Sequence, residues 1–212
     1  MGIIQKIGVI GAGAWGTALA ITARRAGRDV VIQAHEADVV SAINHDNVNH
    51  FFLPGVQLEK GIQATTDLCD MAKCDAVLLA MPAQYLREVT TKTATLWRAD
   101  VPAVICAKGI EQKTGALLSE IAAQTLPEVP LAVLSGPTFA SEVAIGLPTA
   151  VTIASKNLNV GIALSNAIST PTFRAYRSDD VIGVELGGAI KNVLAINQTN
   201  TIPMTWKTIP RT

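Results

Sequence analysis

Apolar and polar residues follow two different periods along the chain, and the opening segment contains both. Residues 6–10 form an apolar run typical of a buried strand, and residues 17–26 carry the apolar stripe of a helix that ends at Gly27. Residues 29–34 form a second run rich in β-branched side chains, which predicts another strand. The chain therefore opens with a predicted strand, helix and strand.

The same alternation continues as far as residue 180. Short apolar runs predict further strands at residues 76–81, 101–106, 131–134, 149–154 and 172–176. Apolar stripes at helical spacing predict helices at residues 37–43, 66–72, 85–96, 114–122 and 158–168, with Thr66 and Thr114 as the N-caps of two of them. Strands that alternate with helices in this way indicate an α/β domain, with a mostly parallel sheet and helices on both faces. We assign residues 1–180 to that domain.

A different pattern begins at Val181. Apolar residues then recur at intervals of four, four and three positions, which predicts a helix with one apolar face. The residues of this stripe are Ile182, Leu186, Ile190 and Val193. We expect residues 181–197 to be the first helix of a second, helical domain. Residues 198–212 are polar and contain Pro203 and Pro210, so we expect them to form a poorly ordered tail.

A glycine pattern, G-x-G-x-x-G, links the first predicted strand to the helix that follows it. In such a unit Gly11 permits a tight turn, Gly13 lets the backbone approach a pyrophosphate, and Gly16 lets the helix pack on the strand. The phosphates then lie at the helix N-terminus, where free N–H groups and the helix dipole favour negative charge. This context predicts a dinucleotide site in a Rossmann-like fold. The alternative is a glycine-rich turn that only lets helix and strand pack closely.

Composition and charge narrow the classes of function. Apolar residues make up 49% of the chain and charged residues 16%, so a large core can be buried. The formal net charge is zero and no basic stripe occurs, which argues against nucleic acid or an anionic membrane as the main partner. No apolar run approaches the roughly 18–20 residues of a membrane span. The cysteines and histidines lack metal-ligand spacing, so we expect no metal site, and free thiols in the cytoplasm.

The ends of the predicted strands are the next candidates, because ligands of open α/β sheets bind outside the carboxyl ends of the strands. Lys108 stands there between small residues, where it can contact a phosphate or a substrate oxygen. The alternative is an ordinary solvated lysine. Thr138 and the backbone N–H groups around Gly136 can bind an anion in the same cleft, and the alternative for this segment is a plain turn.

Two adjacent glycines, Gly187 and Gly188, lie inside the last predicted helix, where each costs about 1 kcal/mol relative to alanine. They lie one turn before Lys191 and Asn192 on the same helix side, which leaves space for a ligand or for another backbone. Desolvation lowers the pKa of a lysine and so suits it to act as a general base. The alternative is that the glycines allow close packing while Lys191 extends to solvent. The residues leave this choice open.

Six motifs in register identify a family resemblance. They are G-A-G-A-W-G-T-A-L-A at residues 11–20, F-L-P-G at 52–55, A-K-G-I-E at 107–111, S-G-P-T-F-A at 135–140, G-L-P-T-A at 146–150 and I-G-V-E-L-G-G-A-I-K-N-V at 182–193. Their order and spacing over residues 4–197 resemble NAD(P)-dependent glycerol-3-phosphate dehydrogenase of the bacterial type. The resemblance implies reversible hydride transfer between C2 of sn-glycerol 3-phosphate and the nicotinamide, with dihydroxyacetone phosphate as the ketone. It also implies a use of the product in phospholipid synthesis.

The resemblance carries residue roles with it. Lys191 matches the catalytic lysine that exchanges a proton with the C2 oxygen, and Lys108 matches a lysine that touches both substrate and cofactor. Gly136 and Thr138 match further substrate contacts. Besides the glycine loop of Gly11, Gly13 and Gly16, the matched cofactor contacts are Ala14, Trp15, His35 and Ala140. The resemblance alone points to His35 and Ala140.

The form of the cofactor depends on the residues at the end of the second predicted strand. An NAD site usually has an acidic residue there, which binds the ribose 2′-hydroxyl. This chain has His35, which can accept a 2′-phosphate, followed by Glu36, which can serve the adenosine ribose. Both NAD and NADP stay open, and we favour NADP(H).

The resemblance ends near Asn197. The family continues there into a glycine-rich segment, a later aspartate and an arginine–asparagine pair, and residues 198–212 match none of them. Without that arginine the substrate phosphate loses charge-assisted bidentate hydrogen bonds. We therefore expect this chain to bind a dinucleotide but to turn over slowly or not at all, so the alternative function is a non-catalytic dinucleotide-binding fragment. The apolar face of residues 182–193 is then exposed or pairs with a second copy, as a homodimer.

Overall fold

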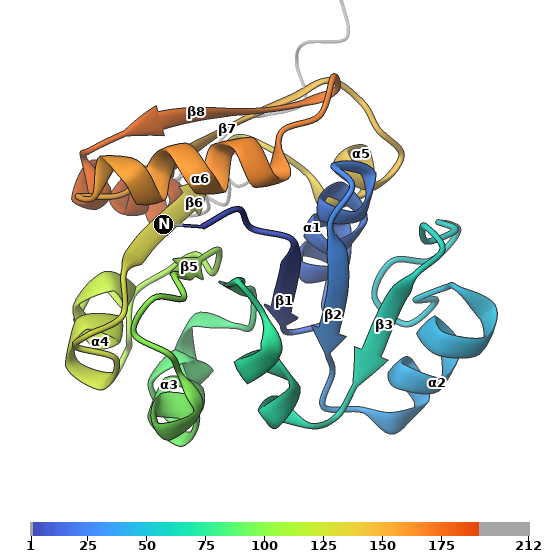
Figure 1. Cartoon of the computed structure of the whole chain (residues 1–212), viewed down its shortest axis with the longest axis horizontal. Helices are drawn as coiled ribbons and strands as arrows, with labels where there is room; N and C mark the ends of the chain where they lie inside the picture. Colours follow the sequence, from blue (N-terminus) through green and yellow to red (C-terminus); the bar gives the residue numbers. More distant parts are fainter. Residues whose placement is uncertain (1, 191–212) are drawn as a thin grey trace, which may run out of the picture.

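The computed structural model describes residues 2–190, which are organised around one eight-stranded sheet (Figure 1). The strand order is β3-β2-β1-β4-β5-β6-β7-β8. Neighbouring strands are parallel except β6 and β7, which are antiparallel. The strands are β1 (Lys6–Ile10), β2 (Asp29–Gln33), β3 (Ile62–Thr65), β4 (Ala76–Leu79), β5 (Ala103–Ile105), β6 (Leu131–Ser135), β7 (Thr149–Ala154) and β8 (Phe173–Ser178).

Helices cover both faces of the sheet, and each face has its own apolar core. One core joins the sheet to α1, α2, α5 and α6, and the other joins the opposite face to η1, α3 and α4. In Figure 1, α3 and α4 lie together on one side, away from α1, α5 and α6. The α-helices are α1 (Ala14–Arg25), α2 (Ala37–Asp46), α3 (Leu86–Thr93), α4 (Leu118–Thr125), α5 (Ala140–Ala144) and α6 (Leu158–Ile168). The short 3-10 helices are η1 (Leu68–Lys73), η2 (Ala83–Tyr85) and η3 (Ala94–Leu96).

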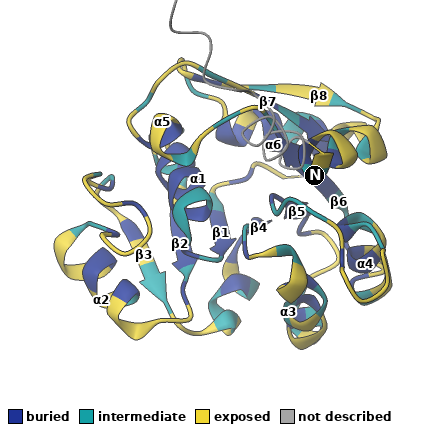
Figure 2. Ribbon diagram, turned by 180° about the vertical axis from the view of Figure 1, so that it is seen from behind, coloured by how far each residue is buried: buried dark blue, intermediate teal, exposed yellow. Residues whose placement is uncertain are grey.

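The central strands send successive side chains into the two cores in turn. Ile7 and Val9 of β1 lie in the core with α1, whereas Ile10 lies in the core with α3 and α4. Leu78 and Leu79 of β4 divide in the same way. Because both faces are covered, these strands are apolar throughout instead of alternating with polar residues. Figure 2 shows the buried strands between the exposed outer faces of the helices.

The structure confirms the predicted α/β fold and contains one strand and one α-helix that were not predicted from the sequence. One is β3, a four-residue strand that pairs with β2 at one edge of the sheet. The other is α5, a five-residue helix that begins directly after the S-G-P-T turn. The predicted helix of residues 17–26 begins earlier, at Ala14, which is the first residue after the second glycine of the motif.

Two predicted N-caps are wrong. At η1 the capping side chain is Asp67, which accepts a hydrogen bond of 2.8 Å from a backbone N–H of that helix, so Thr66 is not the cap. Thr114 does not cap α4, which begins four residues later. Its hydroxyl donates instead to the carboxylate of Glu111, 2.5 Å away. In both places a nearby carboxylate, which is a stronger acceptor than a hydroxyl, determines the local hydrogen bonding.

Residues 181–190 are helical and pack against the sheet domain. Val181 and Val184 contact the core formed with α3 and α4. The buried carboxylate of Glu185 accepts hydrogen bonds from the backbone N–H of Ser119 at 3.1 Å and from its hydroxyl at 2.5 Å. These contacts attach the helix to the first turn of α4.

The predicted elements beyond residue 190 lie outside the described residues. They include Lys191, Asn192 and Val193 of the predicted helix and the expected tail at 198–212. Within residues 2–190, no helix combines the length and the apolar character needed to cross a membrane.

Candidate functional site

The glycine-rich turn between β1 and α1 is shaped by close backbone contacts. Gly11 has a φ of 105°, and a Cβ there would lie 2.8 Å from the backbone nitrogen of Met81. A Cβ on Gly16 would overlap the carbonyl oxygen of Gly11. Gly13 differs, because a Cβ there would have no neighbour within 4 Å among the described residues beyond the adjoining chain. The first and third glycines therefore serve the packing of the turn, and the second faces open space.

The N-terminus of α1 adjoins that space. Gly13 is its N-cap, and among the described residues no side chain caps this end and no acidic residue stands in the first turn. The first backbone N–H groups of a helix have no acceptor within the helix, and the helix dipole makes this end positive. This combination of open space and unpaired donors fits the pyrophosphate of a dinucleotide.

The side chain of Asn49 forms hydrogen bonds with the glycine turn and with α1. It is fully buried, and its side-chain nitrogen donates to the carbonyl oxygen of Ala12 and to the hydroxyl of Thr17, both at 2.8 Å. Its side-chain oxygen accepts a hydrogen bond of 3.3 Å from the backbone N–H of Phe52. Asn49 could not be predicted as a site residue from the sequence, because it stands in a polar stretch and no spacing marks it as buried.

Lys108 brings three of the predicted segments together. It follows β5, and its Nζ donates to the carbonyl oxygen of Gly136 beyond β6, at 3.2 Å. The same Nζ lies 5.9 Å from the centre of the Trp15 ring in the first turn of α1, within the range of a cation–π interaction. Lys108 is half-buried, so it is not an ordinary solvated lysine. The structure places this cation between the glycine turn and the S-G-P-T segment.

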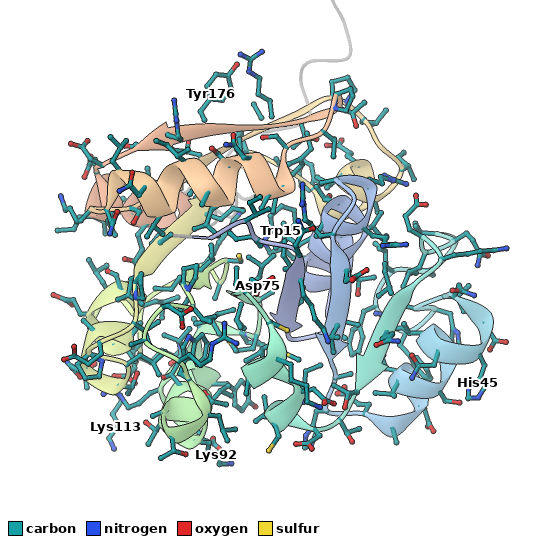
Figure 3. All side chains as sticks on the ribbon, in the orientation of Figure 1. Trp15, His45, Asp75, Lys92, Lys113 and Tyr176 are labelled. Atoms are coloured by element: carbon teal, nitrogen blue, oxygen red, sulfur yellow. The ribbon has the colours of Figure 1, made fainter. Side chains whose placement is uncertain are left out.

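Two buried polar atoms on these segments have no hydrogen-bond partner within the described part of the chain. They are Nε1 of Trp15 and Oγ1 of Thr138. An unpaired buried polar group costs about 1–3 kcal/mol, so such atoms usually belong to sites where a ligand or water completes the pairing. In Figure 3, Trp15 lies inside the fold, whereas His45 and Lys113 extend from its periphery.

The helix of residues 181–190 reaches the same region through Gly188. A Cβ on Gly188 would collide with Oγ of Ser135 at the end of β6 and would lie 3.9 Å from Cγ of Lys108. A Cβ on Gly187 would meet no described atom within 4 Å beyond its chain neighbours and the backbone of its own helix. The two glycines therefore differ, because Gly188 permits close packing and Gly187 leaves open space. Lys191 lies outside the described residues, so its role stays a prediction.

The remaining predicted cofactor residues lie at other strand ends. His35 follows β2 and is exposed, and Ala140 begins α5 and is partly buried against the core that contains α1. Neither has a residue type or spacing that would have identified it from physical reasoning alone. Their roles, like those of the other site residues, remain predictions.

Two ionisable groups within three positions of Lys108 in the sequence have strongly shifted pKa values. The guanidinium of Arg87, and then the hydroxyl of Thr114, lower the pKa of the Glu111 carboxyl to about 2. Burial raises the pKa of the Cys106 thiol well above its usual range. Cys106 is therefore protonated at neutral pH and is unsuited to act as a nucleophile. The chemistry available at this edge is that of a cation and hydrogen-bond donors.

The Rossmann class of dinucleotide-binding domains is defined by an open, mostly parallel sheet with a glycine-rich turn at a helix N-terminus. Ligands of this class bind at the carboxyl ends of the parallel strands, and this chain has that arrangement of strands and turn. The model of one family, the NAD-dependent glycerol-3-phosphate dehydrogenase N-terminus, matches residues 6–161. The chain belongs to this glycerol-3-phosphate dehydrogenase family.

Individual relatives agree with this assignment. The proteins named glycerol-3-phosphate dehydrogenase (NAD(P)+) of Paramagnetospirillum magneticum and Caulobacter vibrioides are 58% and 54% identical to this chain, each over 91% of its length. The crystal structure of glycerol-3-phosphate dehydrogenase from Coxiella burnetii has a TM-score of 0.85 and 38% identity, and the match covers 91% of this chain. The chain spans 70% and 58% of the two relatives' lengths and 59% of the Coxiella chain. These findings confirm the predicted family, fold and cofactor class, NAD or NADP.

Proposed function

We propose that this chain serves reversible hydride transfer between C2 of sn-glycerol 3-phosphate and NAD or NADP, with dihydroxyacetone phosphate as the ketone. The observation that carries the proposal is the position of Lys108, whose Nζ is 3.2 Å from the carbonyl oxygen of Gly136 and 5.9 Å from the ring centre of Trp15. A single cation there can serve both a cofactor at α1 and a substrate at the end of β6. The names of the relatives at 58% and 54% identity support this choice of substrate.

The cofactor residues are proposed from the open end of α1. The open space at Gly13 and the backbone N–H groups of the first turn, which no side chain of residues 2–190 caps, suit the pyrophosphate. The N–H group of the Trp15 indole can donate a further hydrogen bond. When bound, NAD or NADP supplies the site that gives or receives the hydride. The proposed cofactor residues are Gly11, Gly13, Ala14, Trp15, Gly16, His35, Lys108 and Ala140.

The substrate residues are proposed from the opposite side of Lys108. The Lys108 ammonium attracts the negative charge of the substrate, and the buried hydroxyl of Thr138 can donate to a substrate oxygen. Gly136 contributes its backbone. Lys191 is the proposed acid–base residue, which takes the C2 hydroxyl proton during oxidation and returns it to the C2 oxygen during reduction. Gly187, four residues earlier in the sequence, leaves room for a ligand.

The preference between the two cofactor forms is proposed from the end of β2. His35 is exposed there and its imidazole can bind a 2′-phosphate, which favours NADP(H). Replacement of His35 by alanine is expected to weaken NADPH binding more than NADH binding, as measured by titrating tryptophan fluorescence. An unchanged ratio of the two dissociation constants would contradict this preference.

The wider organisation is also a proposal. We divide the chain into a dinucleotide-binding domain at residues 1–180 and the start of a helical domain at 181–197, and we place the protein in the cytoplasm, where its cysteines stay reduced. Ile182, Leu186 and Ile190 are 54%, 37% and 50% exposed, which supports a second copy of the chain as a partner. Light scattering after size-exclusion chromatography tests this, because Leu186→Gln should lower the mass of a homodimer to that of one chain.

The test of the proposed reaction is oxidation of NADPH or NADH that depends on dihydroxyacetone phosphate, measured with the purified chain and with Lys191→Ala. Loss of a general acid–base is expected to reduce kcat by about 100-fold or more while cofactor binding persists. Lys156→Ala is the matched control, because Lys156 is exposed and follows β7 beside the start of β6, at the opposite end of that strand from Gly136. Equal rates in the two lysine variants would contradict the proposal. Absence of turnover by the unmodified chain, with NADPH still bound, would instead favour the alternative of a non-catalytic dinucleotide-binding fragment.

A further inference from the structure

The loop at residues 107–117 presents Lys108 and is folded back on itself. Gly109 has a φ of 129°, so the chain turns immediately after Lys108. An antiparallel bridge pairs Ile110 with Leu117, and the backbone N–H of Glu111 donates to Ala116 at 3.0 Å. These bonds shape the loop internally. Its attachment to the domain comes from two side chains that follow β4.

The first attachment is an ion pair in which the carboxylate is shielded from water. The Glu111 carboxylate accepts hydrogen bonds from Nε of Arg87 at 2.7 Å and from Nη2 at 3.0 Å. It also accepts a hydrogen bond from the Thr114 hydroxyl. Arg87 also donates to Gln124 of α4 at 2.9 Å. The Glu111 side chain is 8% exposed, whereas the acidic partners in the other ion pairs within residues 2–190 are 34–79% exposed. Because water screens this carboxylate less than the others, the pair differs from the ion pairs at the surface.

The second attachment is the side-chain amide of Gln84. Its nitrogen donates to the carbonyl oxygen of Ile110, and its oxygen accepts from the backbone N–H of Gln112, both at 2.9 Å. Gln84 lies in η2 and Arg87 in the first turn of α3. Both therefore come from the segment that follows β4, and both hold the loop that follows β5. Arg87 binds Glu111 itself, and Gln84 binds the residues on either side of Glu111.

We propose that Glu111 is a positioning residue, which holds the loop through Arg87 so that Lys108 stays between Trp15 and Gly136. Glu111 follows Lys108 by three positions, so movement of its side chain is passed to Lys108 through a short stretch of backbone. Displacement of a binding group by about 1 Å can lower a rate by about 100-fold. The proposal rests on the proposed function, because the attachment of the loop serves the contacts of Lys108 with cofactor and substrate.

The test is a double-mutant cycle on cofactor affinity, made in a chain whose other tryptophans are removed by Trp97→Phe and Trp206→Phe. Lys108→Met, Glu111→Gln and the double variant are compared by titrating NADPH and NADH against Trp15 fluorescence. Loss of the charge-assisted contact of Lys108 is expected to weaken binding by about 10-fold. We expect Glu111→Gln to weaken it by a similar factor and the double variant to show no further loss, because Glu111 acts through Lys108.

The emission of Trp15 without cofactor gives a second measurement that needs no bound ligand. Lys108→Met removes the cation 5.9 Å from the ring and is expected to shift the emission maximum. Glu111→Gln should shift it in the same direction, and the double variant should add nothing. If Lys108→Met shifts the emission but leaves cofactor affinity unchanged, the proposed cofactor role of Lys108 fails while the positioning role is decided by the emission of Glu111→Gln alone.

A role in stability alone predicts a different result. In that case Glu111→Gln would lower the thermal midpoint but leave the emission of Trp15 and the cofactor affinity unchanged, and the proposal would be overturned. Losses that multiply in the double variant would also overturn it. Glu59→Gln is the matched control. Glu59 forms an ion pair of 2.8 Å with Arg25, and neither residue belongs to this loop. If Glu111→Gln does not fold, Gln84→Ala loosens the same loop without removing a charge and is judged by the same two measurements.

Discussion

The contact between Gly188 and β6 can be tested by adding a single methyl group. A Cβ on Gly188 would collide with Oγ of Ser135, whereas a Cβ on the adjacent Gly187 would meet no described atom within 4 Å beyond its chain neighbours and the backbone of its own helix. Both residues lie in the same helix, so they share the same helix-forming preference. The pair Gly188→Ala and Gly187→Ala therefore separates packing from backbone effects.

The expected magnitudes follow from these two environments. Alanine stabilises a helix by about 1 kcal/mol relative to glycine, so Gly187→Ala should raise the free energy of unfolding by about 1 kcal/mol and Tm by about 2–4 °C. At Gly188 the same gain is opposed by overpacking, which costs about 1–3 kcal/mol. The net effect of Gly188→Ala should be between no change and a loss of about 2 kcal/mol.

A third variant identifies the atom responsible. Ser135→Ala removes the hydroxyl, and the next atom of that residue, its Cβ, lies at an ordinary 3.5 Å. In this background Gly188→Ala should stabilise the protein by about 1 kcal/mol, like Gly187→Ala. Urea denaturation of the unmodified chain, the three single variants and the Ser135→Ala/Gly188→Ala double variant measures these differences. If Gly188→Ala stabilises the chain as much as Gly187→Ala while Ser135 is intact, then Oγ of Ser135 does not restrict the side chain at position 188.

Three other buried polar contacts give further predictions. The pKa of Glu111 is lowered from 4.5 to about 2, so its pairing stabilises the fold fully above about pH 4.5 and loses that effect as the pH falls toward 2. The stability difference between the unmodified chain and Glu111→Gln should shrink over this range in urea titrations at stepped pH, and a constant difference would contradict the assignment. Glu185→Ala leaves the N–H and hydroxyl of Ser119 unpaired and should cost about 1–3 kcal/mol in the same assay, with Glu185→Gln costing less. Asn49→Ala should cost about 1–3 kcal/mol and also weaken NADPH binding, because it supports the glycine turn, whereas Asn44→Ala, at an exposed asparagine, should leave cofactor affinity unchanged.

The interior strands could be predicted from the sequence because they are apolar on both faces. The run at 76–81 is an example, since its side chains enter two cores and none must be polar. Strand β3 gave no such signal, because it is four residues long at the sheet edge and only Ile62 is buried. Helix α5 has five residues, fewer than two turns, so no periodicity can mark it.

The site residues divide by how local their signal is. Gly11, Gly13 and Lys108 could be predicted because each lies shortly after a predicted strand, and the sequence shows where such a strand ends. Glu111 could not be recognised as buried, since its partner Arg87 stands 24 positions earlier on another element. Asn49 was missed for the same reason, because its acceptors are more than 30 positions away. Burial of a polar side chain depends on such distant partners, which local patterns do not report.

The antiparallel pairing of β6 with β7 has a consequence for how this chain can vary. Strands β7 and β8 run opposite to the other strands. The last residue of β8 therefore lies at the end of the sheet opposite to the carboxyl ends of β1 to β6, where ligands of such sheets bind. The helix at 181–190 must then return far enough to bring Gly188 to the end of β6. Insertion or deletion of one residue before Gly188 would rotate everything after it by about 100° around the helix axis. The length of this helix before Gly188 is therefore fixed. We expect insertions and deletions there to be tolerated less well than those in the surface loops of the same domain.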